Sequence, residues 1–187
     1  MKKVIGFGNA LTDFLVNLGT DSVLDEFGFG KGSMNLVGSE KQRAVQEATA
    51  DLPHTLSLGG STANTMRAMA RLGTEVGYIG KVGRDSTGRF FEAALDNLGI
   101  EPFIFYGQER QGRCLSLGSP DGERTMVTFL GSSIETTTHD ITPAVFNGYD
   151  CLYVEGYQVQ NHEVIEHAIK TAKERGLKVA IDMASYN

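Results

Sequence analysis

The sequence is poor in the residues that define several protein classes. It has only two cysteines, Cys114 and Cys151, and neither belongs to a CxxC pair. We therefore expect two buried, reduced thiols, with no zinc site and no disulfide framework. Its 4 prolines stand against 23 glycines, a balance typical of an ordered chain with many tight turns. The length of 187 residues predicts one globular domain with one sizeable core.

Basic residues and long apolar runs are also scarce. The 17 Lys and Arg residues against 23 Asp and Glu give a net charge of -6. This argues against a nucleic-acid surface, because phosphate binding needs a concentrated basic face. No apolar run approaches the length of a membrane span, and we expect neither a signal peptide nor a membrane partner. Because no N-x-S/T acceptor occurs either, a cytoplasmic location is the simplest expectation.

Three common nucleotide and metal motifs fail on inspection. A GxGxxG loop begins at residue 6 but has Leu11 in place of its third glycine, which argues against an NAD-binding domain. A P-loop around Lys31 would need Ser or Thr at Gly32. His162 and His167 are five positions apart on an expected helix, so they point in different directions and predict no metal site.

Hydrophobic periodicity predicts an α/β fold. Short apolar runs bounded by glycine alternate with helical patterns that begin at a capping residue and end at glycine. Ser39 and Gln42 suit a capping box, and Asp85 suits the cap of a later helix. Consecutive strand-helix units imply a parallel sheet with right-handed crossovers. We expect strands at 4–8, 14–18, 55–58, 76–82, 151–155 and 178–182, and helices at 39–51, 61–72, 85–98 and 161–175.

The period changes to two between residues 100 and 130. Strands are expected at 102–106, 113–117 and 125–130, and the turn Pro120-Asp121-Gly122-Glu123 joins the last two as an antiparallel hairpin. Regular strand-helix order then resumes up to a strand at 178–182. A parallel strand so close to the end of the chain predicts an incomplete sheet, because such strands are normally covered on both faces and paired on both edges.

The strongest local signal for a site is the turn Gly59-Gly60 followed by Asn64. Two glycines between a strand and a helix let a ligand approach the backbone, and an amide one turn later can donate and accept hydrogen bonds. Glycine pairs at such turns are common, so on spacing alone a purely structural role is the commoner explanation.

Three linked blocks change this balance. The chain has GGSTANT at 59–65, ARLG at 70–73 and GKVGRDSTG at 80–88, in this order. They resemble the N-terminal signature of the ribokinase-like (PfkB) family of ATP-dependent sugar and nucleoside kinases. The opening GFGNALTD at 6–13, PDGERTM at 120–126 and EGY at 155–157 are similar to the adenosine kinase branch. The resemblance covers nearly the whole chain and implies a three-layer α/β/α core, a mostly parallel sheet and a small β lid.

Roles for individual residues follow from the resemblance. Asp13 would accept hydrogen bonds from two sugar hydroxyls as a specificity residue, and Asn64 would bind another hydroxyl. Arg124 would stabilise the charge on the transferring phosphate, although a solvated hairpin charge is an equal alternative. Tyr157 would stack on a base or sugar face, with a core position as its alternative. The implied substrate site consists of Asn9, Leu11, Asp13, Gly59, Gly60, Ser61, Asn64 and Tyr157.

The resemblance also implies what lies outside this chain. Lid segments at about 14–38 and 100–130 would close over the substrate, and because some members pair through this lid, a homodimer is a candidate assembly. In the family, ATP and Mg2+ are held by a C-terminal half with an N-x-x-E block and a GAGD turn, whose Asp is the catalytic base. Neither motif occurs here, so we expect residues 1–187 to be the N-terminal part of one kinase domain, inactive alone.

The expected function is phosphorylation of a sugar or nucleoside hydroxymethyl group, with adenosine as the leading acceptor. Another carbohydrate kinase, of ribokinase or fructokinase type, and a non-catalytic sugar-binding fragment remain as alternatives. All of these require the Asp13 carboxylate and the Asn64 amide to converge on one pocket.

Overall fold

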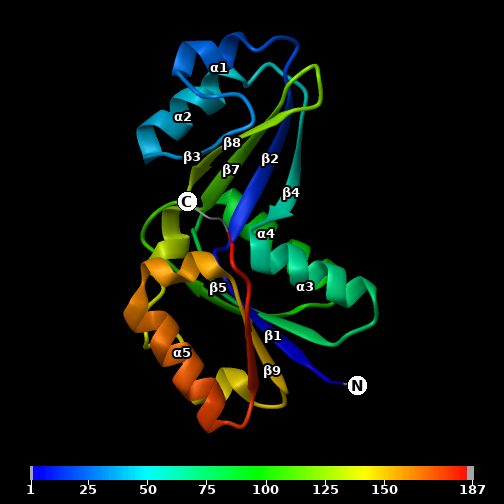
Figure 1. The fold of residues 1–187 in the computed structure, drawn as a ribbon, viewed down its shortest axis with the longest axis vertical. Coiled ribbons are helices and arrows are strands. Elements are labelled where there is room, and N and C mark those ends of the chain that lie inside the picture. The colour runs from blue at the N-terminus through cyan, green and yellow to red at the C-terminus, as the bar shows by residue number, and fades with distance from the viewer. Residues whose placement is uncertain (1, 185–187) are drawn as a thin grey trace.

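The computed structural model describes residues 2–184, which form two five-stranded sheets (Figure 1). The chain passes between the two sheets several times. Sheet A has the order β10-β9-β1-β5-β6 and is parallel throughout. Sheet B has the order β3-β8-β7-β2-β4 and is mixed. Sheet A consists of β1 (Val4–Phe7), β5 (Val76–Val82), β6 (Glu101–Tyr106), β9 (Cys151–Val154) and β10 (Lys178–Ile181). Sheet B consists of β2 (Leu11–Asn17), β3 (Met34–Leu36), β4 (His54–Gly59), β7 (Gly112–Gly118) and β8 (Arg124–Phe129).

Helices cover both faces of sheet A. On one face, Ile5 and Phe7 pack against α5 through Val164 and Ala168. On the other, the buried Tyr78 packs in one cluster with residues of α3 and α4. This sandwich is the predicted α/β/α core, with apolar strands that are buried on both sides. The helices are α1 (Ser22–Phe27), α2 (Ser39–Ala48), α3 (Ser61–Arg71), α4 (Ser86–Asn97) and α5 (His162–Glu174), with short 3-10 turns η1 (Gly131–Glu135), η2 (Pro143–Phe146) and η3 (Gly156–Gln160).

Sheet B is covered by helices α1 and α2 on one face only. Phe14 and Leu115 belong to the apolar cluster on that face, together with Leu24 of α1 and Val45 of α2. Side chains alternate between the two faces of a strand, so Asp13 lies on the opposite face. Sheet B lies over the α3 and α4 end of the core in Figure 1.

Several sequence predictions are confirmed. The hairpin of β7 and β8 is antiparallel, and Gly122 in its turn has a φ of 91°. The Asp85 carboxylate caps α4 by accepting from the backbone amides of Thr87 and Gly88. The predicted apolar faces of α3 and α5 are buried at Met66 and Ala168, among others.

Two strands lie in the other sheet from the one expected. The 55–58 strand was expected to start a parallel strand-helix unit, but β4 is an edge strand of sheet B, antiparallel to β2. The 102–106 strand was expected beside the hairpin as part of the lid, but β6 pairs in parallel with β5 in sheet A. It follows α4 after Gly99, so the pair is an ordinary right-handed crossover. From the 100–130 range, sheet B therefore takes only the residues from Gly112 onward.

Local boundaries also differ. β2 begins at Leu11, so Asp13 lies inside the strand and not at its end. The cap of α2 is Gly38, without a side-chain hydrogen bond, and α2 ends at Ala48. The prediction of a capping box at Ser39 and Gln42 is wrong. The side-chain oxygens of both residues accept hydrogen bonds from the Arg110 guanidinium instead. Cys114 is buried as expected, but Cys151 is only partly buried; both are free thiols.

Candidate functional site

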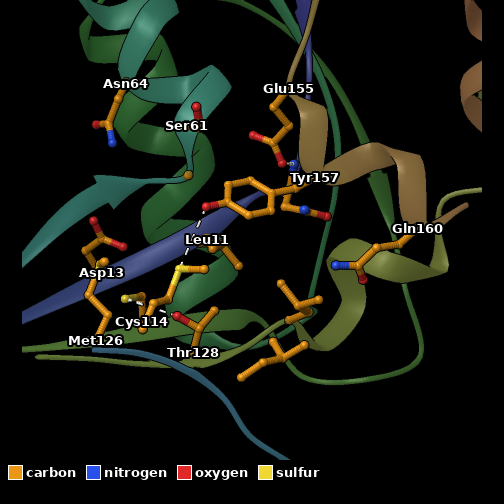
Figure 2. A pocket seen from close by; sticks show the side chains of 15 residues that line it. Leu11, Asp13, Ser61, Asn64, Cys114, Met126, Thr128, Glu155, Tyr157 and Gln160 are labelled. Atoms are coloured by element: carbon orange, nitrogen blue, oxygen red, sulfur yellow. Dashed lines mark hydrogen bonds between the residues drawn. The ribbon is translucent and has the colours of Figure 1, made fainter. Parts of the chain in front are cut away.

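A pocket of about 240 Å³ lies between the second face of sheet B and the carboxyl ends of strands β1 and β9 (Figure 2). Open α/β sheets place ligands at this end of their strands. Seven of the eight substrate-site residues expected from the sequence line it. The pocket is lined by Asn9, Leu11, Asp13, Met34, Leu36, Gly60, Ser61, Asn64, Cys114, Met126, Thr128, Leu130, Glu155, Tyr157 and Gln160.

Asp13 presents a carboxylate to this pocket. It lies in register between Ser57 of β4 and Cys114 of β7. No donor among residues 2–184 hydrogen-bonds its oxygens, so their acceptor capacity is free for a ligand. Burial raises the pKa of Asp13 to about 6, and the charges of Arg67 and Arg124 oppose that rise. The folded protein therefore holds a desolvated carboxylate that a hydroxyl donor would stabilise.

Asn64 lies opposite Asp13, one turn into α3. Figure 2 shows its side-chain nitrogen turned toward the Asp13 side of the pocket and its oxygen turned away. The oxygen accepts from the Arg67 guanidinium at 2.7 Å. The carboxylate and the amide thus converge on one pocket, as the sequence prediction required.

The paired glycines make room for protein atoms. A Cβ at Gly59 would overlap the Asp13 carboxylate, and Gly59 itself does not line the pocket. Gly60 has a φ of 89°, and a Cβ there would overlap the carbonyl oxygen of Asn9. We expected these glycines to accommodate the sugar ring; the structure shows that they let the strand carrying Asp13 approach the start of α3.

Glu155, at the end of β9, joins the segment after β1 to the first turn of α3. Its side chain is 1% exposed, and its carboxylate accepts from the backbone amides of Asn9 at 2.7 Å and Thr62 at 3.0 Å. Burial raises the pKa of Glu155, and the two amide hydrogen bonds counter this by favouring the ionised form. Glu155 is therefore mainly a clamp that fixes the positions of Asn9 and the α3 start.

Three other expected residues have distinct positions. Ser61 lines the pocket, but its hydroxyl donates to Asp182 at 3.1 Å. Tyr157, from η3, is partly exposed and extends its ring across the pocket, so it is not a core tyrosine (Figure 2). Arg124 is exposed at the start of β8 and is not among the lining residues. Its positive charge nevertheless opposes the rise that burial causes in the pKa of Asp13 and of Cys114.

The sequence prediction missed the sheet B wall of the pocket. Thr128 and Cys114 are register partners, and the Thr128 hydroxyl donates to the Cys114 sulfur at 3.4 Å. Burial, with the Asp13 charge, raises the pKa of Cys114 to about 12. The period-two pattern of the hairpin was the available signal, but without the register it does not say which alternate residues face the pocket. The residues missed on this wall and beside it are Met34, Leu36, Cys114, Met126, Thr128, Leu130 and Gln160.

No group of three or more His, Cys, Asp or Glu side chains within residues 2–184 is arranged to hold a metal ion. Over the same residues, no helix is both long and apolar enough to span a membrane.

Comparison with known proteins identifies the family. Residues 30–185 match the pfkB family of carbohydrate kinases, so the chain belongs to this family. A 5-dehydro-2-deoxygluconokinase of Geobacillus thermodenitrificans is 38% identical over 169 residues, which are 86% of this chain and 49% of that protein. The chain spans about half the length of the curated relatives it matches.

Solved structures confirm the ribokinase-like fold. An adenosine kinase from Sinorhizobium meliloti has a TM-score of 0.86 at 28% identity, with 98% of this chain and 57% of that chain covered. The apo adenosine kinase of Trypanosoma brucei brucei has a TM-score of 0.88 at 22% identity, with 98% and 58% covered, and so it supports the fold alone.

Proposed function

We propose that this chain is the acceptor-binding part of an ATP-dependent kinase that phosphorylates the hydroxymethyl group of a nucleoside, with adenosine as the leading acceptor. The observation that carries this proposal is that a carboxylate and an amide lie beside an apolar wall in the same pocket. Asp13 and Asn64 lie together at one end. Leu36, Met126 and Leu130 lie along the sheet B wall.

This division suits a molecule with a polar and a flat apolar half. A ribose at the polar end would donate a hydroxyl to Asp13 and accept from Asn64. A nucleobase would lie against the Tyr157 ring and the Met126 side chain, since thioethers and aromatic rings make favourable contacts with flat ring systems. The Tyr157 hydroxyl contacts the Met34 sulfur at 3.8 Å, so Met34 would border the base and not stack on it. Membership of the family and the similarity to the S. meliloti adenosine kinase support the same assignment.

The other half of the reaction belongs to the complete protein. Family membership supports ATP and Mg2+ as the phosphoryl donor and its metal ion. Sheet B would act as a lid that excludes water, which otherwise competes for the phosphoryl group. A role for Arg124 at the transferring phosphate, a homodimer through sheet B and a cytoplasmic location stay predictions.

A sugar kinase without a base site is the second candidate. It is supported by the name of the G. thermodenitrificans relative, a 5-dehydro-2-deoxygluconokinase, at 38% identity. A ribokinase-type or fructokinase-type acceptor falls in the same class. A sugar acid carries polar groups around its whole length, which suits the leucine and methionine wall less well. For the 187-residue chain alone, sugar binding without turnover is a third possibility.

Acceptor preference of the complete protein tests the proposal. With ATP and Mg2+, kcat/KM would be measured for adenosine, ribose, fructose and 5-dehydro-2-deoxygluconate. We expect adenosine to exceed ribose by about 100-fold, the scale of contacts with an additional apolar group. Faster turnover of 5-dehydro-2-deoxygluconate than of adenosine would overturn the nucleoside assignment. Calorimetry of the 187-residue chain with adenosine would show whether this part binds the acceptor alone.

A further inference from the structure

Arg67 is not a pocket residue, yet it hydrogen-bonds Asn64 and its charge acts on Asp13. It lies on α3 three residues after Asn64, so the two side chains are neighbours on the helix surface. One guanidinium nitrogen donates to the Asn64 side-chain oxygen at 2.7 Å, and another donates to the Ser57 hydroxyl at 3.3 Å. Arg67 therefore links the first helix of the core to the edge strand β4 of sheet B.

The contact with Arg67 fixes the orientation of the Asn64 amide. A guanidinium has only donors, so the amide must turn its oxygen toward Arg67 and its NH2 group away. The nitrogen has no acceptor among the described residues and faces the Asp13 side of the pocket (Figure 2). Without Arg67, the amide could rotate by half a turn and present its oxygen instead.

Arg67 also acts on the acceptor side of the pocket. Ser57, which it contacts, is the register partner of Asp13 on β2. Burial raises the pKa of Asp13, and two nearby positive charges, those of Arg67 and Arg124, oppose this rise. The effect of Arg67 is the larger of the two. One guanidinium thus favours a hydrogen-bond donor at Asn64 and an ionised acceptor at Asp13.

We propose that Arg67 is a positioning residue that sets the donor and acceptor polarity of the pocket, so that the site selects a vicinal diol. One hydroxyl donates to Asp13, and its neighbour accepts from the Asn64 amide. This inference rests on the proposed function, because it assumes that the acceptor carries such a diol. The residue touches no reacting atom and works only through Asn64 and Asp13.

Discrimination between an acceptor and its deoxy analogues tests this role in the complete protein. The acceptor is the one that the wild type phosphorylates fastest; for adenosine, the analogues are 2′-deoxyadenosine and 3′-deoxyadenosine. The Asn64→Ala variant first shows which analogue reports on Asn64. We expect Arg67→Met to lower the kcat/KM ratio of the acceptor to that analogue by about tenfold, the effect of about 1.4 kcal/mol.

Matched variants separate positioning from a structural effect. Arg67→Lys keeps the positive charge and a donor but not the two-pronged geometry, so it should retain more of the discrimination than Arg67→Met. Arg71→Met, at the exposed end of the same helix, removes an equal charge and should leave the ratio unchanged. In an Asn64→Ala background, Arg67→Met should change the ratio no further.

The outcomes distinguish this inference from the proposed function. If Arg67→Met lowered kcat/KM for all acceptors equally, or if the Asn64→Ala background left its effect on the ratio intact, Arg67 would have no positioning role. A wild type that prefers a sugar over adenosine overturns only the nucleoside assignment, since the same ratios are then measured with that sugar and its deoxy analogues. A wild type that neither binds nor phosphorylates any of these acceptors overturns both.

Discussion

Sheets A and B have the same number of strands, but sheet A forms the core and sheet B lines the pocket. Sheet A is parallel, and apolar residues such as Phe7 and Tyr78 are fully buried on its two faces. Sheet B is mixed and has an apolar cluster on one face, while its other face carries Asp13 and Cys114 into the pocket. Burial on both faces therefore stabilises a sheet, whereas one uncovered face leaves room for side chains that bind a ligand.

Truncation of a core side chain tests the stability half of this comparison. Phe7→Ala removes a fully buried ring from sheet A and should lower the free energy of unfolding by about 3–5 kcal/mol. Met126→Ala, on the pocket face of sheet B, should cost about 1 kcal/mol, because a partly buried methionine has only part of the roughly 1.5–3 kcal/mol of full burial to lose, and should raise the KM for the acceptor. Urea unfolding measures both; equal losses would remove the distinction between the sheets.

Loss of the Asp13 carboxylate tests the recognition half. In the complete protein, Asp13→Ala should weaken acceptor binding by about 100-fold or more, since each hydrogen bond to a charged group contributes about 1.5–3 kcal/mol. ATP binding should remain nearly intact. Calorimetry with each ligand provides the comparison, and unchanged acceptor affinity would remove the central assignment.

A neutral substitute at Asp13 should stabilise the ligand-free protein, although it weakens acceptor binding. The pKa of this carboxyl is raised from 3.8 to about 6, so at pH 7 the folded state holds a charge that its surroundings disfavour. Asp13→Asn removes this cost and should stabilise the ligand-free protein by at most about 3 kcal/mol, while acceptor binding falls. A thermal melt at pH 7 and at pH 4 checks the sign, since the gain should shrink as Asp13 of the wild type becomes protonated.

Acceptor affinity should also depend on pH, with the smallest effect of the set. Asp13 is ionised above a pH of about 6 and loses its charge below it. The groups around it are the cations Arg67 and Arg124 and the Cys114 thiol. Acceptor KM should therefore be flat above pH 7 and rise by up to about tenfold per unit below pH 6. In Asp13→Asn this acid limb should disappear; if it persisted, another group would be responsible.

The order of secondary structure was predictable because periodicity and capping are local. The Asp85 cap, the Gly122 turn and the apolar face of α5 follow from residues close together in the chain. Membership of strands in sheets was harder. The pattern of β4 does not reveal that its partner is β2, some 40 residues earlier, and a strand followed by a glycine turn and a helix suggested a parallel unit instead.

The pocket followed the same division. Asp13 and Asn64 were found from motifs, because each stands in a short run of characteristic residues. Cys114, Met126 and Thr128 were missed because their exposure to the pocket depends on the register of β7 and β8. Arg67 was missed because its contact with Ser57 of β4 depends on how α3 packs against sheet B, although its spacing of three residues from Asn64 was visible in the sequence.

The clamp made by Glu155 has a consequence for the order of events during synthesis. It holds together Asn9 and Thr62, both of which leave the ribosome long before it does. A nascent chain that has not yet reached β9 lacks this carboxylate link, although the Thr62 hydroxyl can already donate to the Phe7 carbonyl. The complete geometry of this end of the pocket can therefore form only after residue 155 has been synthesised.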